Sequence, residues 1–169
     1  MNTINYYLEK LNAKEKDFGK LGDACELAVR EYLTGKEQVK VKSQGKKDAY
    51  FSYLENGKVK KMTCEIKIGC GEIDNLEKSQ IIFYAPEIDL NEPIENQVFV
   101  FSRQEWIDFI NGYDGRGKLI RIDSKRNHKH IQSFYSETRP KASKPIANYI
   151  WKTCLEKKTL ADWKMEKKG

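Results

Sequence analysis

The sequence is poor in soft metal ligands, since it holds only four cysteines and two histidines among 169 residues. The cysteines stand at positions 25, 64, 70 and 154, and no two of them form a CxxC pair. Structural zinc sites are usually built from such pairs together with histidines. We therefore expect no structural zinc site, and we expect free thiols in a reducing compartment.

Long apolar runs are also missing, and no stretch approaches the length of a membrane span. The first residues lack the pattern of a signal peptide. There is no GxxxxGK loop, so we expect no bound nucleoside triphosphate. With 39% hydrophobic and 33% charged residues, the chain is polar but globular. We expect one domain over residues 1–169, in the cytoplasm and without a membrane partner, and nothing in the sequence indicates a homodimer.

The charge is unevenly distributed along the chain. Residues 113–169 hold 15 Lys and Arg against 6 Asp and Glu, a net charge of +9, whereas residues 1–112 have a net charge of −3. Residues 71–108 are acidic, with nine carboxylates against Lys78 and Arg103. A basic C-terminal extension over 113–169 is typical of a protein with a surface for a polyanion. A solvated, lysine-rich tail is the alternative.

A hairpin is predicted around Asn56-Gly57, which separates two strand-like runs, 48–54 and 59–68. Asn-Gly is a strong hairpin signal because a two-residue type I′ turn needs positive φ at both positions. This turn would pair Glu55 with Lys58, so that paired residue numbers sum to 113. Asp48 and Glu65 have the same sum. They would face each other across the two strands, with Lys67 on the same face two residues further on.

Two opposed carboxylates repel each other unless a positive charge lies between them. One interpretation is a site for a hard cation such as Mg²⁺, in which Lys67 orients a water or stabilises developing charge. The other is a solvent-exposed hairpin on which Lys46 or Lys67 simply neutralises the acids. The Glu-x-Lys spacing alone does not decide, because it recurs at residues 156–158 and 166–168.

The runs 45–48 (Gly-Lys-Lys-Asp) and 64–68 (Cys-Glu-Ile-Lys-Ile) resemble the PD-(D/E)XK nuclease superfamily. In that superfamily an Asp on one strand and a Glu-x-Lys on the next form the metal site, and Lys47 stands where many members have proline. The resemblance implies an α/β fold with a restriction-endonuclease-like core at about 16–112. Its elements would be a helix, a three-stranded mixed or antiparallel meander, a helix and a strand, with an extra strand and helices.

The resemblance also implies roles for individual residues. Asp48 and Glu65 would hold Mg²⁺, or Mn²⁺ in its place, with the Ile66 carbonyl as a further ligand. Lys67 would position and polarise the attacking water, and Glu26, on the preceding helix, would supply a supporting carboxylate. Glu26 flanks the apolar stripe of that helix, and an exposed helix acid is its alternative reading.

These residues predict a metal-dependent endonuclease that hydrolyses phosphodiester bonds, with DNA as its substrate. The first alternative is a catalytically inactive nucleic-acid-binding or regulatory protein on the same fold. A second alternative is a protein-interaction subunit that uses the acidic surface of 71–108. We expect phosphate contacts from six basic residues of the C-terminal part: Arg121, Lys125, Arg126, Lys129, Arg139 and Lys141. His128 and His130 lack supporting ligands and are assigned to a basic surface loop.

Hydrophobic periodicity and turn signals outline the remaining elements. A helix is predicted over Lys16–Leu33 with Gly35 as its stop, and a glycine-bearing exit is predicted after Ile68. Residues 115–117 and 121–130 are read as loop-like and basic. Further elements are predicted as strands at 38–42, 81–84 and 97–101, helices at 72–79 and from the Ser102-x-x-Glu105 capping box to Gly112, and a final helix after Pro145 with Ile146, Tyr149, Ile150 and Leu155 as its apolar side. The ordered part is expected to end at Thr159–Trp163.

Overall fold

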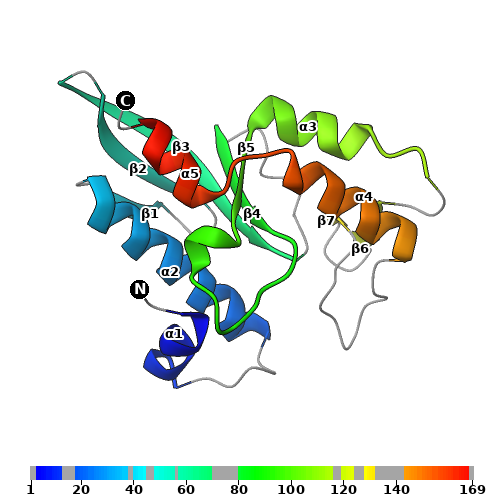
Figure 1. The fold of residues 1–169 in the computed structure, drawn as a ribbon, viewed down its shortest axis with the longest axis horizontal. Helices are drawn as coiled ribbons and strands as arrows, with labels where there is room; N and C mark the ends of the chain where they lie inside the picture. The colour runs from blue at the N-terminus through cyan, green and yellow to red at the C-terminus, as the bar shows by residue number, and fades with distance from the viewer. Residues whose placement is uncertain are drawn as a thin grey trace.

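A computed structural model describes residues 3–12, 18–37, 40–44, 48–55, 57–69, 80–115, 119–123, 128–131 and 143–167. It is an α/β fold built on an open, mixed five-stranded sheet with strand order β1-β2-β3-β4-β5, and a separate two-stranded ribbon, β6-β7 (Figure 1). The strands are β1 (Lys40–Gln44), β2 (Asp48–Glu55), β3 (Lys58–Ile68), β4 (Ile81–Ala85), β5 (Phe99–Ser102), β6 (Ile120–Asp123) and β7 (His128–Ile131). The helices are α1 (Ile4–Lys10), α2 (Phe18–Glu37), η2 (Ile94–Asn96), α3 (Arg103–Asn111), α4 (Lys144–Leu155) and α5 (Leu160–Lys167).

The five-stranded sheet begins as an antiparallel meander of β1, β2 and β3. β3 then pairs in parallel with β4, and β4 pairs antiparallel with β5. Only the second half of β3 is paired with β4, from Cys64↔Ile81 to Ile68↔Ala85. The predicted helix at 72–79 falls outside the described residues.

The register of the β2–β3 hairpin is the predicted one. The pairs run from Glu55↔Lys58 at the turn to Ala49↔Cys64, and every pair sums to 113. Gly57 has φ +77°, the left-handed conformation that a type I′ turn requires and that glycine adopts without steric cost. Asn56 lies outside the described residues. The sequence signal therefore fixed the register of the two strands that carry Asp48 and Glu65.

The sheet separates two hydrophobic clusters because side chains alternate between its faces. On β4, Ile81, Phe83 and Ala85 join the first cluster, which α1, α2 and the start of α5 cover. Ile82 and Tyr84 join the second cluster, which α3 and α4 cover. In Figure 1, α2 lies on the side of the meander, and α3 and α4 lie together at the other end of the sheet. Each face of the central strand β4 is thus buried by a different set of helices.

Helix boundaries differ from the prediction at the N-terminal end. α2 runs through Gly35 and ends at Glu37, so Gly35 is not its stop. A single glycine weakens a helix by only about 1 kcal/mol, which tertiary packing of the preceding turns can override. α1 was not predicted, although Ile4, Tyr7 and Leu8 are buried in the first cluster. β1 covers the second part of the strand predicted at 38–42 and extends to Gln44, and residues 38 and 39 lie outside the described residues.

The capping box at the start of α3 is confirmed in both directions. The Glu105 backbone N–H donates to the Ser102 hydroxyl oxygen at 3.1 Å, and the Ser102 backbone N–H donates to Glu105 Oε1 at 3.0 Å. The helix ends before Gly112, also as predicted. The two bonds satisfy donors that every helix start would otherwise leave unpaired.

The basic stretch after residue 113 is more regular than predicted. β6 and β7 form an antiparallel ribbon where a loop was expected, with Ile120 paired to Ile131. Ile120 and Ile122 alternate with charged residues, which is a strand pattern, but the density of basic residues outweighed it in the prediction. α4 begins with Pro145 in its first turn, as expected. Leu155, however, is 70% exposed, and Cys154 takes the buried position instead.

The C-terminal segment completes the sheet and both clusters. The Val100 backbone N–H donates to the Lys158 carbonyl at 2.9 Å, and the Leu160 N–H donates to the Val98 carbonyl at 2.8 Å. This pairing covers the outer edge of β5, where unpaired groups would otherwise invite association. α5 continues to Lys167, so the ordered part extends beyond Trp163, where it was expected to end. Among the described helices, none combines the length and the apolar character that crossing a bilayer requires.

Candidate functional site

Glu65 and Lys67 lie on the part of β3 that is paired with β4. Glu65 is opposite Ile82, and Lys67 is opposite Tyr84. Both partners belong to the second hydrophobic cluster, so the alternation of the strand puts Glu65 and Lys67 on the face that α3 and α4 cover. Cys64 is paired with Ile81, and both residues belong to the first cluster. Cys64 is therefore on the opposite face.

The two charged side chains are buried rather than solvated. Lys67 Nζ lies 3.6 Å from Glu65 Oε2, and the side chains are only 14% and 7% exposed. A separation of 3.6 Å is that of an ion pair and is too long for a direct hydrogen bond. Neutralisation in solvent, one of the two interpretations of the sequence, is therefore wrong for these two residues. Two charges have been removed from water, which costs several kcal/mol each before compensation.

Asp48 is the first residue of β2, where its backbone pairs with Gln44 of β1. Its side chain is outside the described part of the chain. The hairpin pairing ends at Ala49↔Cys64, one step short of Asp48, and the next pair in the same register is Asp48 with Glu65. Directly opposed residues of an antiparallel pair have Cβ atoms about 5 Å apart. The backbone thus offers Asp48 a position from which it and Glu65 could share one cation.

Ile66 is paired with Phe83, and its partly buried side chain packs against the first cluster. This packing anchors the strand between the two charged residues on the other face. The role predicted for Ile66 belongs to its backbone carbonyl and stays a prediction.

The structure places Glu26 in an ion pair on its own helix. Arg30 Nη2 donates to Glu26 Oε1 at 2.6 Å, one turn further along α2. α2 packs on the Cys64 face of β3, through Ala24, Cys25 and Ala28. The Glu26 carboxylate is therefore held by Arg30 on the side of the sheet opposite to the side chains of Glu65 and Lys67.

The thiol of Cys64 is influenced by charges on both sides of the sheet. Its pKa is raised to about 12, chiefly by burial, with smaller contributions from the charges of Glu65 and Glu26, which raise it, and of Arg30, which lowers it. Cys64 is thus a protonated, inert core residue that lies between the α2 ion pair and the Glu65 site. Cys25, Cys64 and Cys154 are all free thiols, as predicted.

Of the six predicted phosphate-binding residues, the structure describes the backbone of two. Arg121 pairs with His130, and Lys129 pairs with Ile122. Their register positions are adjacent across the ribbon rather than opposed, and adjacent positions belong to opposite faces. Lys125, Arg126, Arg139 and Lys141 lie outside the described residues. One flat face of the ribbon therefore does not combine Arg121 with Lys129.

The sequence prediction missed the residue that fixes the end of β3. The Tyr84 hydroxyl donates to the Gly69 carbonyl at 2.7 Å in a buried position. Gly69 has φ +69°, a left-handed conformation that fits the tight turn predicted after Ile68. Tyr84 is also the strand partner of Lys67. A tyrosine inside the apolar run 81–84 is a usable signal, because its buried hydroxyl needs an acceptor.

Among the side chains that the structure describes, no three His, Cys, Asp or Glu residues gather closely enough to hold a metal. The predicted arrangement needs only two carboxylates and a carbonyl, and one of those carboxylates, Asp48, is outside that set. Comparison with protein-family models, with curated proteins and with solved structures gives no match to the chain.

Proposed function

We propose that the chain is a metal-dependent endonuclease that hydrolyses phosphodiester bonds in DNA, with its site on β2 and β3. The observation that carries the proposal is the buried Glu65–Lys67 pair, at 3.6 Å, on a strand whose register leads directly to Asp48. The element order supports it too: α2, an antiparallel meander and then a strand parallel to β3 form the order expected of a restriction-endonuclease-like core.

The donor set suits a hard divalent cation. It offers two carboxylates from neighbouring strands, and Mg²⁺ binds through one or two carboxylates plus its substrate's phosphate oxygens. Such a cation, when bound, would polarise the phosphate and neutralise the charge that develops on it. Asp48, Glu65 and the Ile66 carbonyl would hold it there.

Lys67 has a separate task in the proposed reaction. Its ammonium group lies beside Glu65 in a partly dehydrated position, where a positive charge acts more strongly than it does in water. It would orient the attacking water and stabilise the negative charge of the transition state. While no cation is bound, the same group compensates the buried Glu65 carboxylate.

The first experiment compares cleavage of mixed single- and double-stranded DNA in Mg²⁺, Mn²⁺ or Ca²⁺ by the wild type, Glu65→Gln and Lys67→Ala. The matched control is Lys152→Ala, an exposed lysine of α4. Folding of each variant is checked by circular dichroism. We expect loss of cleavage by a factor of about 10²–10³ or more for the two site variants, and none for the control.

The alternative, an inactive nucleic-acid-binding protein on the same fold, predicts a different pattern. DNA would then be bound but not cut, with binding unchanged by Lys67→Ala. A direct Mn²⁺-binding titration separates the two cases without an activity assay, because Asp48→Asn and Glu65→Gln should each abolish uptake if the site holds a cation. Retention of Mn²⁺ by both variants would count against the proposal.

A further inference from the structure

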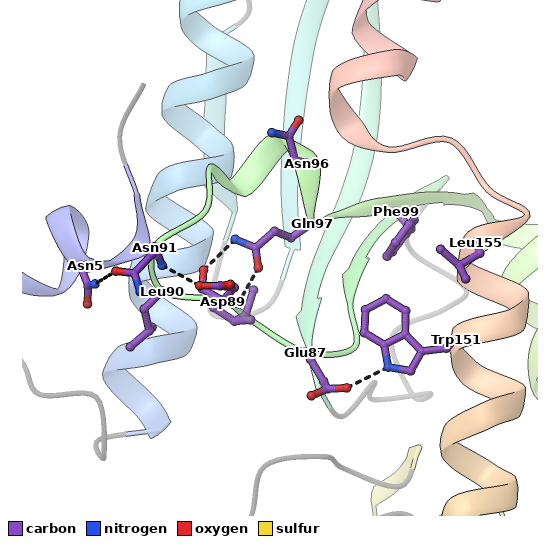
Figure 2. Close-up of a pocket in the computed structure, with 11 residues that line it drawn as sticks. Asn5, Glu87, Asp89, Leu90, Asn91, Asn96, Gln97, Phe99, Trp151 and Leu155 are labelled. Atoms are coloured by element: carbon purple, nitrogen blue, oxygen red, sulfur yellow. Dashed lines mark hydrogen bonds between the residues drawn. The ribbon is translucent and has the colours of Figure 1, made fainter.

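A second site lies away from Glu65, in a cavity of about 850 Å³ beside α4. Figure 2 shows that the loop following β4 forms one wall and that α4 and β5 form the other. This volume is in the range of ordinary ligand pockets. The lining includes residues 87–91, which belong to the acidic stretch 71–108 that the proposed nuclease activity leaves unexplained.

The apolar wall comes from a second stripe of α4. Its first stripe, Ile146, Ile150 and Cys154, is buried in the second cluster. The second stripe consists of Trp151, next to Ile150, and Leu155, next to Cys154. Trp151 and Leu155 are one turn apart on the same side of the helix. Leu155 is 70% exposed, although it ends a helix that is otherwise well packed. Trp151 is half-buried against the second cluster, so the fold covers this stripe only in part and leaves Leu155 exposed.

The aromatic part of this wall is held in one orientation. The Trp151 and Phe99 rings meet edge to face, with centroids 6.0 Å apart. The Trp151 indole N–H donates to Glu87 Oε1 at 2.8 Å, and this bond connects α4 to the loop that follows β4 (Figure 2). The indole is therefore fixed between an aromatic neighbour and a carboxylate.

The opposite wall is acidic and rigid. Glu87 and Asp89 are the charged residues of the lining, and both are negative. The Gln97 side chain ties the loop together, accepting from the Asp89 backbone N–H at 2.7 Å and donating to the Asp89 and Glu92 carbonyls at 2.9 Å. Its shape exists before any ligand arrives, which lowers the entropic cost of binding.

We propose that this cavity is a docking site for an extended peptide segment of a protein partner, in which a Lys or Arg stands next to an aliphatic or aromatic residue. The apolar side chain would cover Trp151 and Leu155, and the cation would lie against Glu87 and Asp89. Asn96, also in the lining, can donate to or accept from a peptide backbone. The acidic lining repels phosphate, so nucleic acid is not the occupant. The proposal does not depend on the nuclease activity.

The test is selection of a random heptapeptide display library on the immobilised full chain, followed by fluorescence anisotropy with the enriched peptides. We expect enrichment of peptides that pair a basic residue with an apolar one. Leu155→Ser should weaken their binding about tenfold, and so should Glu87→Gln, while Asp108→Asn, an exposed change on α3 outside the cavity lining, should not. Both variants should keep the cleavage activity of the wild type.

A second measurement locates the binding. The indole N–H resonance of Trp151, assigned with Trp151→Phe, should shift on peptide addition, and that of the buried Trp106 should not. Three outcomes overturn the proposal: selection that enriches no basic peptide, enriched peptides whose affinity is unchanged in both Leu155→Ser and Glu87→Gln, or equal binding of argininamide alone. Concentration-dependent dimerisation that Leu155→Ser abolishes would also overturn it, because a second copy would then be the occupant.

Discussion

Two lysine–glutamate pairs in this molecule illustrate different uses of the same chemistry. Lys157 Nζ lies 2.9 Å from Glu105 Oε2 at the surface side of α3, where the side chains are 19% and 45% exposed. Lys67 Nζ lies 3.6 Å from Glu65 Oε2, and these side chains are 14% and 7% exposed. The shorter contact is therefore the more solvent-accessible one. The longer contact is the more buried one, where removing the two charges from water costs more free energy.

The Glu105 pair has a structural role. Glu105 also accepts from the Ser102 backbone N–H in the capping box, and the Lys157 ammonium lies 5.6 Å from the centre of the Phe101 ring. It links the start of α3 to the segment that follows α4. The Glu65 pair is a loose contact at high desolvation cost, and a buried ion pair is weak support for stability. Charged residues buried on a mostly apolar face of a sheet are a local conflict that is typical of a functional site.

The largest predicted effect separates the two partners of the buried pair. Lys67→Met leaves the Glu65 carboxylate buried without this ammonium group, which should reduce the free energy of unfolding by about 3–5 kcal/mol in metal-free buffer. Adding Glu65→Leu should restore it to the wild-type value or above. Urea unfolding of the wild type, Lys67→Met and the double variant gives both numbers. If the double variant is as unstable as Lys67→Met, the pair is structural and the contrast with Glu105 fails.

The same series has a control and an internal check. Lys157→Met breaks the accessible pair and should cost less than 1 kcal/mol, since exposed ion pairs contribute little. In the wild-type site a bound cation should compensate Glu65, so Mg²⁺ should recover part of the stability that Lys67→Met loses. An equal effect of Mg²⁺ on Lys157→Met would show only a general salt effect.

The next effect concerns the support of the site. Tyr84→Phe removes the hydroxyl that donates to the Gly69 carbonyl in a buried position, which should cost about 1–3 kcal/mol in urea unfolding. Because Gly69 follows the strand segment that carries Lys67, we also expect a fall in kcat with little change in KM. Tyr149→Phe is the control, as its hydroxyl also donates to a backbone carbonyl, that of Phe109, away from the site. An equal loss of kcat in Tyr149→Phe would show that Tyr84 does not position the site.

Sequence predicted the local features of this fold well, because their causes are local. The Asn56-Gly57 turn gave the full β2–β3 register, and the Ser102-x-x-Glu105 pattern gave the start of α3. Both depend on a few neighbouring residues with strict backbone or hydrogen-bond requirements. The Glu65–Lys67 contact followed from the same logic, since alternation along one strand places them on one face.

What sequence did not predict depends on tertiary contacts. Lys67 is buried on a strand whose partner in the sheet, Tyr84, is 17 residues further along the chain, and the pairing of Lys158 and Leu160 with the β5 edge joins segments about 60 residues apart. Leu155 was assigned to the core by its spacing, but the helix presents the neighbouring stripe instead. Periodicity identifies an apolar stripe without identifying which of two adjacent stripes meets the sheet.

A smaller effect is expected from the capping box itself. Ser102→Ala removes the hydroxyl that accepts from the Glu105 N–H and should cost about 1 kcal/mol, the usual value for an N-cap. Thermal unfolding by circular dichroism measures it, and Ser143→Ala is the comparison because Ser143 makes no side-chain cap bond to α4. The two losses should differ clearly. If the two losses are the same, the capping box does not contribute to the structural role of Glu105.

The smallest effect is a pH dependence that belongs to the Glu105 pair. Burial raises the pKa of Glu105, but bonds from the Ser102 N–H and from Lys157 outweigh it, so that the pKa lies below its ordinary value of 4.5. The unfolded chain therefore binds this proton first as the pH falls, and the stabilisation that Glu105 gives is present above pH 4.5 and is lost on acidification through the lowered pKa. Relative to Glu105→Gln, the wild type should be more stable near pH 7 and lose that advantage progressively as the pH falls below 4.5, in urea unfolding at matched ionic strength. An advantage that grows on acidification would mean that the carboxylate is not stabilised in the folded chain, and Glu105 would no longer be the structural counterpart of Glu65.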